Sequence, residues 1–262
     1  MEVPLERLNR ELYDDTFGRV WRLAVFDGLH DGREFINLGG AALLDGIARR
    51  ARIGRGSRVL ELCSGPGAVA AHLARRYGCR VTGVDINGRQ VAHARAMRRR
   101  LPAATARRLR FLRADACVWR PRTAFDLVVS IDAFMLLADS ASALGAARES
   151  LVPGGRLAIA TLASGPRIDR AFRRFAGDTD GMVNLQDAAD YVRLGKAAGF
   201  ERVRVRNLTP MAIRASARMM ACLRAIEAGD GWTRTSQVYL DALEDGRLEY
   251  LLVSARRGTP AD

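Results

Sequence analysis

Short runs of hydrophobic and β-branched residues alternate with segments of helical periodicity from Arg58 to near the end of the chain. The hydrophobic runs predict strands, and the segments between them predict amphipathic helices. The run Phe125–Ser130 is fully apolar at its centre, which is typical of a strand buried in a parallel sheet. The expected strands are Arg58–Leu62, Arg80–Val84, Leu109–Arg113, Phe125–Ser130, Arg156–Thr161, Glu201–Asn207 and Glu249–Ser254. Because helices separate successive strands, we expect a parallel sheet with right-handed crossovers.

The helical segments predict one domain rather than two independent folds. After Arg58 the expected helices are Gly67–Tyr77, Gly88–Arg99, Ala141–Leu151, Ile168–Phe175, Leu185–Ala198 and Ala212–Ala228. Pro153-Gly154-Gly155 is expected to end one of them, and Gly199 is placed as the glycine that follows another. Helical spacing before Arg58 covers Leu5–Leu12, Thr16–Phe26 and Asn37–Ala51. We therefore predict a helical cap over residues 1–36 and a domain over 37–262, with insertions around 162–186 and 208–247.

A glycine-rich segment joins the first expected strand to the helix that follows it. Gly65 and Gly67 let the backbone approach a ligand closely, and the start of the helix presents free N–H groups. Asp85 ends the second expected strand, 20 residues after Gly65, where an acid accepts hydrogen bonds from ribose hydroxyls. The segment also satisfies G-x-G-x-x-A, the dinucleotide-binding pattern, so an NAD(P) enzyme is one interpretation.

Two details of this segment favour a different nucleoside. Glu61 lies within the first strand, and Cys63 and Ser64 set the first glycine back from it. The sequence E-L-x-x-G-x-G followed by V-T-G-V-D resembles the corresponding motifs of class I S-adenosylmethionine (SAM) methyltransferases. The resemblance extends from Asn37 to Arg257. It implies an α/β, Rossmann-like, seven-stranded, mostly parallel sheet with an antiparallel last strand.

The same resemblance implies SAM as the cofactor and S-adenosylhomocysteine as the product, and it implies which residues bind them. The loop then faces the methionine moiety, Asp85 holds the ribose, and Asp115 lies near the adenine. The implied cofactor-binding residues are Tyr13, Glu61, Gly65, Gly67, Asp85, Ile86, Gln90, Asp115, Ala116 and Ser130. The implied catalytic residues are Tyr13, His30 and Asp132.

Each of these candidates has a plainer structural interpretation. Asp85, Asp115 and Asp132 are also typical of residues that cap a helix or a turn. Gln90, Tyr13 and His30 are equally typical of a solvated helix face, a helix packing contact and a surface loop, and these alternatives stay open at the level of sequence.

A narrower resemblance points to small-molecule acceptors. Gly28-Leu29-His30-Asp31-Gly32 and the segment Gln90–Arg95 are similar to sarcosine and dimethylglycine N-methyltransferases, and to cyclopropane-synthase-like and terpenoid C-methyltransferases. Two departures are visible: Cys63-Ser64 replaces the family's glycine-cysteine, and Ala133–Leu137 lacks the family's histidine. The resemblance implies methyl transfer to nitrogen or carbon of a small metabolite, in natural-product biosynthesis. A small-molecule O-methyltransferase, an RNA methyltransferase and a non-catalytic SAM-binding relative are the alternatives.

The charge of the chain changes this picture little. Lys and Arg total 42 against 29 Asp and Glu, a net charge of +13, yet Lys196 is the only lysine. Such arginine usage is typical of codon bias in a bacterium, so we discount it as a sign of nucleic-acid binding. The fourth expected strand is not followed by the motif of base methylation, and no nucleic-acid partner is expected. Arg167, Arg170, Arg173 and Arg174 recur at helical spacing and either bind an anionic acceptor or form a solvated face.

The remaining features exclude several classes of protein. The four cysteines show no C-x-x-C spacing, so neither a metal site nor a disulfide framework is expected. No run of about 18 apolar residues predicts a membrane span, and the first residues contain no apolar signal segment. We expect a cytoplasmic protein, and the sequence leaves the oligomeric state open, with a homodimer among the alternatives.

Overall fold

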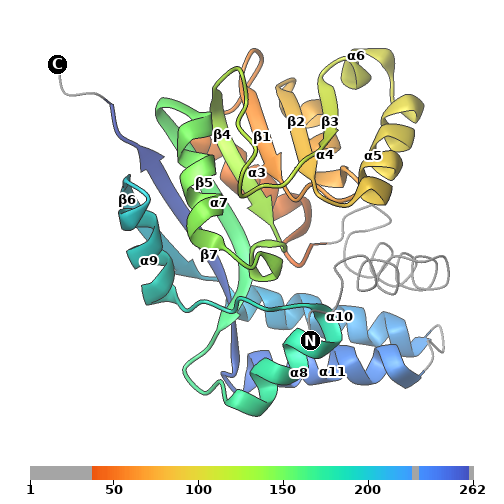
Figure 1. The fold of residues 1–262 in the computed structure, drawn as a ribbon. Coiled ribbons are helices and arrows are strands. Elements are labelled where there is room, and N and C mark those ends of the chain that lie inside the picture. Colours follow the sequence, from red (N-terminus) through yellow and green to blue (C-terminus); the bar gives the residue numbers. More distant parts are fainter. Residues whose placement is uncertain (1–36, 226–229, 260–262) are drawn as a thin grey trace.

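The structure is a computed structural model that describes residues 37–225 and 230–259. Its centre is a sheet of seven strands in the order β3-β2-β1-β4-β5-β7-β6 (Figure 1). The strands are β1 (Arg58–Leu62), β2 (Arg80–Asp85), β3 (Leu109–Arg113), β4 (Phe125–Ile131), β5 (Leu151–Ser164), β6 (Phe200–Asn207) and β7 (Leu248–Arg257). Neighbouring pairs from β3 to β5 are parallel, whereas β7 runs antiparallel to both β5 and β6. The predicted fold class is therefore confirmed.

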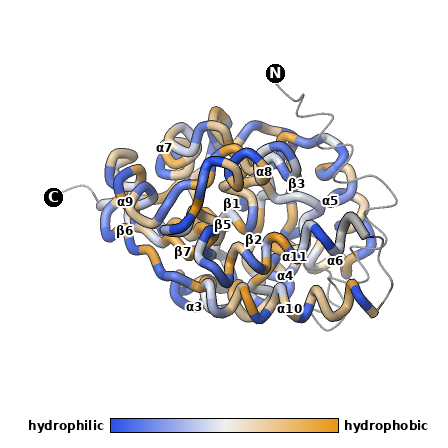
Figure 2. Tube along the Cα trace, turned by 90° about the horizontal axis from the view of Figure 1, so that it is seen from below, coloured by the Kyte–Doolittle hydropathy of each residue, from blue (hydrophilic) through white to orange (hydrophobic). Residues whose placement is uncertain are grey.

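Helices cover both faces of the sheet. One face carries α3 (Gly40–Ala51), α4 (Ala68–Tyr77) and α5 (Gly88–Arg100), whose apolar sides join one buried cluster with β1, β2 and β4. The other face carries α7 (Ser140–Ser150), α9 (Ala188–Ala197) and the short helix η1 (Phe134–Leu136) in a second cluster. Figure 2 shows hydrophobic residues concentrated along the central strands, with hydrophilic stretches in the surrounding helices. This distribution is what the alternating pattern of the sequence requires.

Three helices stand at the edge of the sheet where the parallel strands end. These are α8 (Arg170–Asp180), α10 (Thr209–Ala225) and α11 (Asp230–Glu244), which Figure 1 shows grouped together. They follow the carboxyl ends of β5 and β6 and precede the start of β7, so the topology places them there. Phe172 of α8 meets Tyr239 of α11 edge to face, with ring centroids 6.2 Å apart. Tyr239 also donates a hydrogen bond to Asp180, which ties the two helices further.

The structure departs from the predicted elements at several places. β5 begins at Leu151 and runs through Pro153-Gly154-Gly155, where an interruption was expected. Proline is tolerated because the pairing of β5 with β7 starts only at Arg156, so no ladder hydrogen bond is lost. The short helices α6 (Ala103–Ala106) and η1 and the whole of α11 were not predicted, and α8 ends at Asp180 rather than at Phe175. No helix in the described part of the chain is both long enough and apolar enough to span a membrane.

Candidate functional site

The glycine loop between β1 and α4 has an unusual backbone. Cys63, Gly65 and Gly67 all have positive φ angles, +55°, +50° and +88°. A Cβ atom on Gly67 would lie 2.7 Å from Cζ of Phe111, so only glycine fits there. A Cβ atom on Gly65 would meet nothing within 4 Å, which means that the backbone at Gly65 borders open space. The loop is thus closed on one side by β3 and open to a ligand on the other.

Asp85 at the end of β2 is bonded directly to this loop. Its Oδ2 accepts a hydrogen bond from the N–H of Gly65 at 2.8 Å, and its Oδ1 accepts one from the N–H of Asn87 at 2.8 Å. Burial raises the pKa of Asp85, and the two amides oppose that shift. A carboxylate offers about four acceptor positions, so both oxygens keep capacity for donors such as vicinal hydroxyls. Ile86 beside it is 46% exposed, an apolar side chain without cover.

Two further candidates, on β1 and on α5, are buried. Glu61 is 3% exposed, and burial raises the pKa of its carboxyl well above the usual range, against the opposing effect of the Ala70 amide. Its Oε2 atom and the Oγ of Ser64 have no hydrogen-bond partner among the described residues. Gln90 is buried on α5 rather than solvated, which removes the plainer interpretation of this residue.

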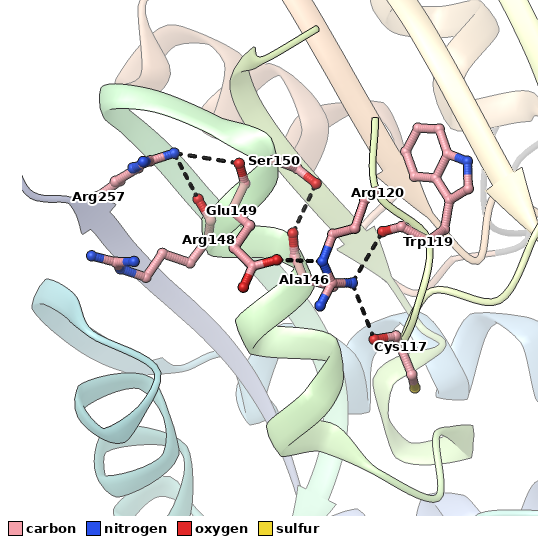
Figure 3. A network of polar contacts seen from close by, with 8 residues as sticks. All are labelled: Cys117, Trp119, Arg120, Ala146, Arg148, Glu149, Ser150 and Arg257. Atoms are coloured by element: carbon pink, nitrogen blue, oxygen red, sulfur yellow. Dashed lines mark hydrogen bonds and ion pairs between the residues drawn. The ribbon is translucent and has the colours of Figure 1, made fainter. Parts of the chain in front are cut away.

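The segment after β3 places Asp115 in a turn. Asp115 Oδ1 accepts a hydrogen bond from the N–H of Cys117 at 2.8 Å, so the capping interpretation holds for this oxygen. Ala116 next to it is buried. Arg120 donates to the carbonyl oxygens of Cys117 and Trp119 and pairs with Glu149 of α7 (Figure 3). This arginine fixes the segment that carries Asp115 against the neighbouring helix.

The end of β4 carries a second set of polar groups. Asp132 has a positive φ of +52°, and its Oδ2 accepts a hydrogen bond from the N–H of Leu38 at 2.9 Å. Burial raises the pKa of Asp132 to about 6, opposed by the Leu38 amide and the Tyr250 hydroxyl. Four buried polar atoms here have no hydrogen-bond partner among the described residues: Ser130 Oγ, Asn37 Nδ2, Asn37 Oδ1 and Asp132 Oδ1. Buried polar atoms left unpaired cost free energy, so this corner is suited to a polar ligand group.

Not every candidate can be placed. Tyr13 and His30 lie outside the described residues.

The arginines after β5 and the loop cysteine have plainer roles. Arg173 donates to the backbone carbonyl of Leu185 at 2.9 Å, and Arg167 donates to that of Asp245 at 3.5 Å. Burial raises the pKa of the Cys63 thiol, which disfavours the reactive thiolate.

Sequence reasoning missed Tyr250 and the Leu38 amide. Tyr250 lies inside the hydrophobic run of β7, where a tyrosine carries no signal beyond that of a core residue. Leu38 acts through its backbone, which no side-chain pattern reveals. The structure therefore gathers one set of groups around Asp85 and another around Asp132.

The chain matches a family model described as a methyltransferase domain, over residues 34–205. Among curated proteins it is 28% identical over 258 residues to O-methyltransferase cnsE of Penicillium expansum, covering 94% of this chain and 91% of that protein. It is 36% identical over 103 residues to trans-aconitate 2-methyltransferase of Streptomyces avermitilis, covering 39% of this chain and 38% of that protein.

A solved structure shows the same fold. It is phosphoethanolamine N-methyltransferase 2 of Haemonchus contortus, in complex with phosphomonomethylethanolamine and S-adenosylhomocysteine. The TM-score is 0.84 at 22% identity, with coverage of 96% of this chain. The chain spans only 59% of the length of that protein, as it spans only 38% of the trans-aconitate methyltransferase.

Proposed function

The chain belongs to the methyltransferase domain family, and on that premise we propose that it transfers a methyl group from SAM to nitrogen or carbon of a small molecule, in natural-product biosynthesis. The observation that carries the proposal is the hydrogen bond from Gly65 N–H to Asp85 Oδ2, which joins the open glycine loop to an acid at the end of β2. The family match favours this function over the dinucleotide interpretation of the same loop.

The residues present fit SAM. A nucleoside needs a donor or acceptor for its ribose diol, apolar cover for its base and a close approach to backbone. Asp85 keeps free acceptor positions, Ile86 is exposed beside it, and the backbone at Gly65 borders open space. When bound, SAM supplies a methyl group on a positively charged sulfur and leaves as S-adenosylhomocysteine.

We propose a role for each of the candidate residues. Asp85 binds the ribose hydroxyls, and the glycine loop with Glu61 borders the methionine end. We assign the second oxygen of Asp115 to the adenine, and Ile86 and Ala116 to the apolar cover of the same base. Gln90 and Ser130 are buried polar groups that we assign to the same site. Tyr13 and His30 stay predictions for the cap over residues 1–36, and a homodimer stays an open alternative.

The chain's contribution to the reaction is mainly alignment. Holding an acceptor in line with the transferred methyl group contributes up to about 7–11 kcal/mol of barrier reduction in ideal cases. Asp132 lies at the end of β4 with one oxygen held by Leu38 and the other unpaired. In the proposed transfer the acceptor atom would form a bond to the methyl carbon of SAM, and the bond from that carbon to sulfur would break with its electron pair kept on sulfur. Asp132 would take up the proton that the acceptor loses.

An oxygen acceptor is the second candidate. The protein that matches this chain over 94% of its length is an O-methyltransferase. A hydroxyl must lose its proton during transfer, and a carboxyl with a pKa of about 6 is ionised at neutral pH. The two candidates differ in the acceptor atom and use the same site.

Calorimetric titration with S-adenosylhomocysteine tests the cofactor, with NADH as the comparison ligand. Micromolar binding of the first alone supports the proposal, and binding of NADH alone contradicts it. Panels of amines, hydroxylated compounds and carbon nucleophiles are then incubated with SAM, and S-adenosylhomocysteine formation is measured. SAM that binds but is never converted with any acceptor would favour a non-catalytic relative.

The cap is tested by removing residues 1–35. We expect turnover to be lost while S-adenosylhomocysteine still binds, because a cap excludes water from the transfer step. Full turnover of the shortened protein would show that the cap is dispensable.

A further inference from the structure

Tyr250 is a buried tyrosine whose hydroxyl has no described partner. It lies within β7 opposite Leu162 of β5, and its side chain is 0% exposed. Its N–H donates to Thr209 Oγ1 at 2.9 Å, and its carbonyl accepts from the N–H of Leu208 at 2.7 Å. The backbone is thus fixed on two sides. A buried phenol normally finds a hydrogen-bond partner, so the unpaired hydroxyl requires an explanation.

Asp132 lies near Tyr250, because the carbonyl of Ala160 accepts its N–H and Leu162, two residues further along β5, pairs with Tyr250. The two groups lie close enough for each to shift the pKa of the other. Asp132 Oδ1 is likewise unpaired among the described residues, whereas its Oδ2 is held by Leu38. The backbone N–H of Asp132 donates to the carbonyl of Ala160 at 2.8 Å, and the φ of Asp132, +52°, lies in the left-handed region. Such a strained backbone persists only where the surroundings hold it, and it is common at functional sites.

We propose that Tyr250 is a positioning residue of the acceptor site, donating its hydroxyl to Asp132 Oδ1 and holding the carboxylate toward an acceptor atom that carries a proton. The inference rests on the proposed function and deepens it. The acceptor class it names is an amine or a hydroxyl with at least one proton on the methylated atom. That proton passes to the remaining lone pair of Asp132 and then to solvent, while the phenol keeps its own proton.

The electrostatics agree with this direction of donation. Burial, together with the charge of Asp132, raises the pKa of the Tyr250 phenol well above its usual value. The phenol is therefore the donor at any ordinary pH. Besides burial, the groups that act on Asp132 are the Leu38 amide and this hydroxyl, and both favour the ionised carboxylate.

Tyr191 provides a matched control on the other face of the sheet. It is also 0% exposed, and its hydroxyl also has no described partner. It lies on α9 and packs against Phe134 at a centroid distance of 6.4 Å. Asp132 does not act on its pKa, which burial raises to about 12. A general effect of removing a buried hydroxyl is therefore separable from an effect on Asp132.

The test compares Tyr250→Phe with Tyr191→Phe in the full chain. The carboxyl carbon of Asp132 is followed by NMR in ¹³C-labelled protein, with its signal assigned through Asp132→Asn. Loss of one hydrogen bond to the charged form should raise the Asp132 pKa by about half a unit to one unit in Tyr250→Phe. Tyr191→Phe should leave it unchanged. An Asp132 titration that is identical in wild type and Tyr250→Phe, or equally shifted in both variants, overturns the proposal.

A second measurement does not depend on the folding of the Tyr250 variant. In the unsubstituted protein the Tyr250 Cζ resonance should move between pH 4 and 8 with the same midpoint as Asp132, and Asp132→Asn should abolish that movement. A Tyr250 resonance that ignores the ionisation of Asp132 contradicts the pairing.

Kinetics with an acceptor found by screening then address function. Tyr250→Phe should lower kcat at least tenfold with the KM for SAM unchanged, and should move the acid limb of the pH profile upward. If wild-type protein binds no S-adenosylhomocysteine, the proposed function fails while the NMR titrations still decide the pairing. If it binds and the titrations show no coupling, the pairing fails and the proposed function stands.

Discussion

Two aspartates end parallel strands of the same sheet and are held in different ways. Asp85 of β2 receives a backbone N–H on each oxygen, from Gly65 and Asn87. Asp132 after β4 receives one backbone N–H, from Leu38 on Oδ2, and its Oδ1 has no partner among the described residues. The partners of Asp85 lie within 20 residues of it, whereas Leu38 and Asp132 are 94 residues apart. The first acid is thus fixed by neighbouring loops and the second by elements from opposite ends of the domain.

This difference divides the site into two halves. The half around Asp85, called the general half, is held by nearby backbone amides, and the half around Asp132 depends on distant elements. Backbone amides do not depend on side-chain identity, so the Asp85 arrangement tolerates sequence change around it. The Asp132 arrangement depends on where α3 and β7 lie, and side-chain substitutions can retune it. We infer that the β1-β2-β3 half provides cofactor binding, and that the half from β4 to β7 determines which acceptor reacts.

The largest expected effect, on the free energy of unfolding, comes from substituting Gly67 in the general half of the site. In Gly67→Val a Cβ enters a space where Phe111 Cζ lies 2.7 Å away, at a φ of +88°. Overpacking and backbone strain together should lower the free energy of unfolding by about 4 kcal/mol. Urea denaturation followed by circular dichroism measures this as a lower midpoint.

Gly145→Ala in α7 is the matched control, because a Cβ there meets nothing within 4 Å. It should raise the free energy of unfolding by up to about 1 kcal/mol through helix propensity. Equal destabilisation by both substitutions would contradict the assigned role of Gly67.

The same contrast explains how much the sequence revealed. The ends of β1 to β4 were predicted to within one residue, because short apolar runs between glycines and polar residues define them. Asp85 was predictable since its spacing from the glycine loop is local. The contact of Leu38 and the role that we propose for Tyr250 were not, because they arise from tertiary packing between distant segments. Helix α11 was missed because Thr233, Thr235 and Ser236 are weak helix formers, and packing on α10 and α8 overrides their propensity.

Asp85→Ala should break cofactor binding while leaving the acceptor half intact. Loss of the ribose contact should weaken S-adenosylhomocysteine binding at least tenfold, which is about 1.4 kcal/mol. Asp126→Ala is the matched control, since Asp126 also accepts a backbone N–H, from Arg58 at 2.8 Å, but at the opposite end of the sheet. Calorimetry that finds unchanged affinity for Asp85→Ala, or an equal loss for Asp126→Ala, would sink the assignment.

The ionisation of Asp132 should make kcat/KM depend on pH. Its pKa is raised from 3.8 to about 6, so the carboxylate becomes protonated as the pH falls through about 6. We expect kcat/KM to fall on that acid side, because a protonated carboxyl cannot accept the proton of the acceptor.

The effect of Asp132 on stability has the opposite sign. Between its unfolded value of 3.8 and about 6 the folded state binds more protons, so this group makes the free energy of unfolding decrease as the pH rises. Asp132→Asn should remove this slope and leave S-adenosylhomocysteine affinity unchanged. A pH–rate profile without an inflection near 6 would show that no base of this pKa is needed.

The smallest effect is expected at the exposed arginines of α8, which belong to the acceptor half. Arg170 and Arg174 are exposed and make no ion pair within the described part of the chain, unlike Arg173, which donates to the Leu185 carbonyl. Arg174→Ala should change the free energy of unfolding by less than about 0.5 kcal/mol, because exposed side chains of this kind contribute little. The informative measurement is the KM for the acceptor once one is known. An unchanged KM means that α8 presents a solvated face and that the Asp132–Tyr250 corner alone selects the acceptor. A KM that rises tenfold or more means that the acceptor carries an anionic group which α8 binds. The enzyme would then select its acceptor by charge as well as by the proton on the atom that is methylated.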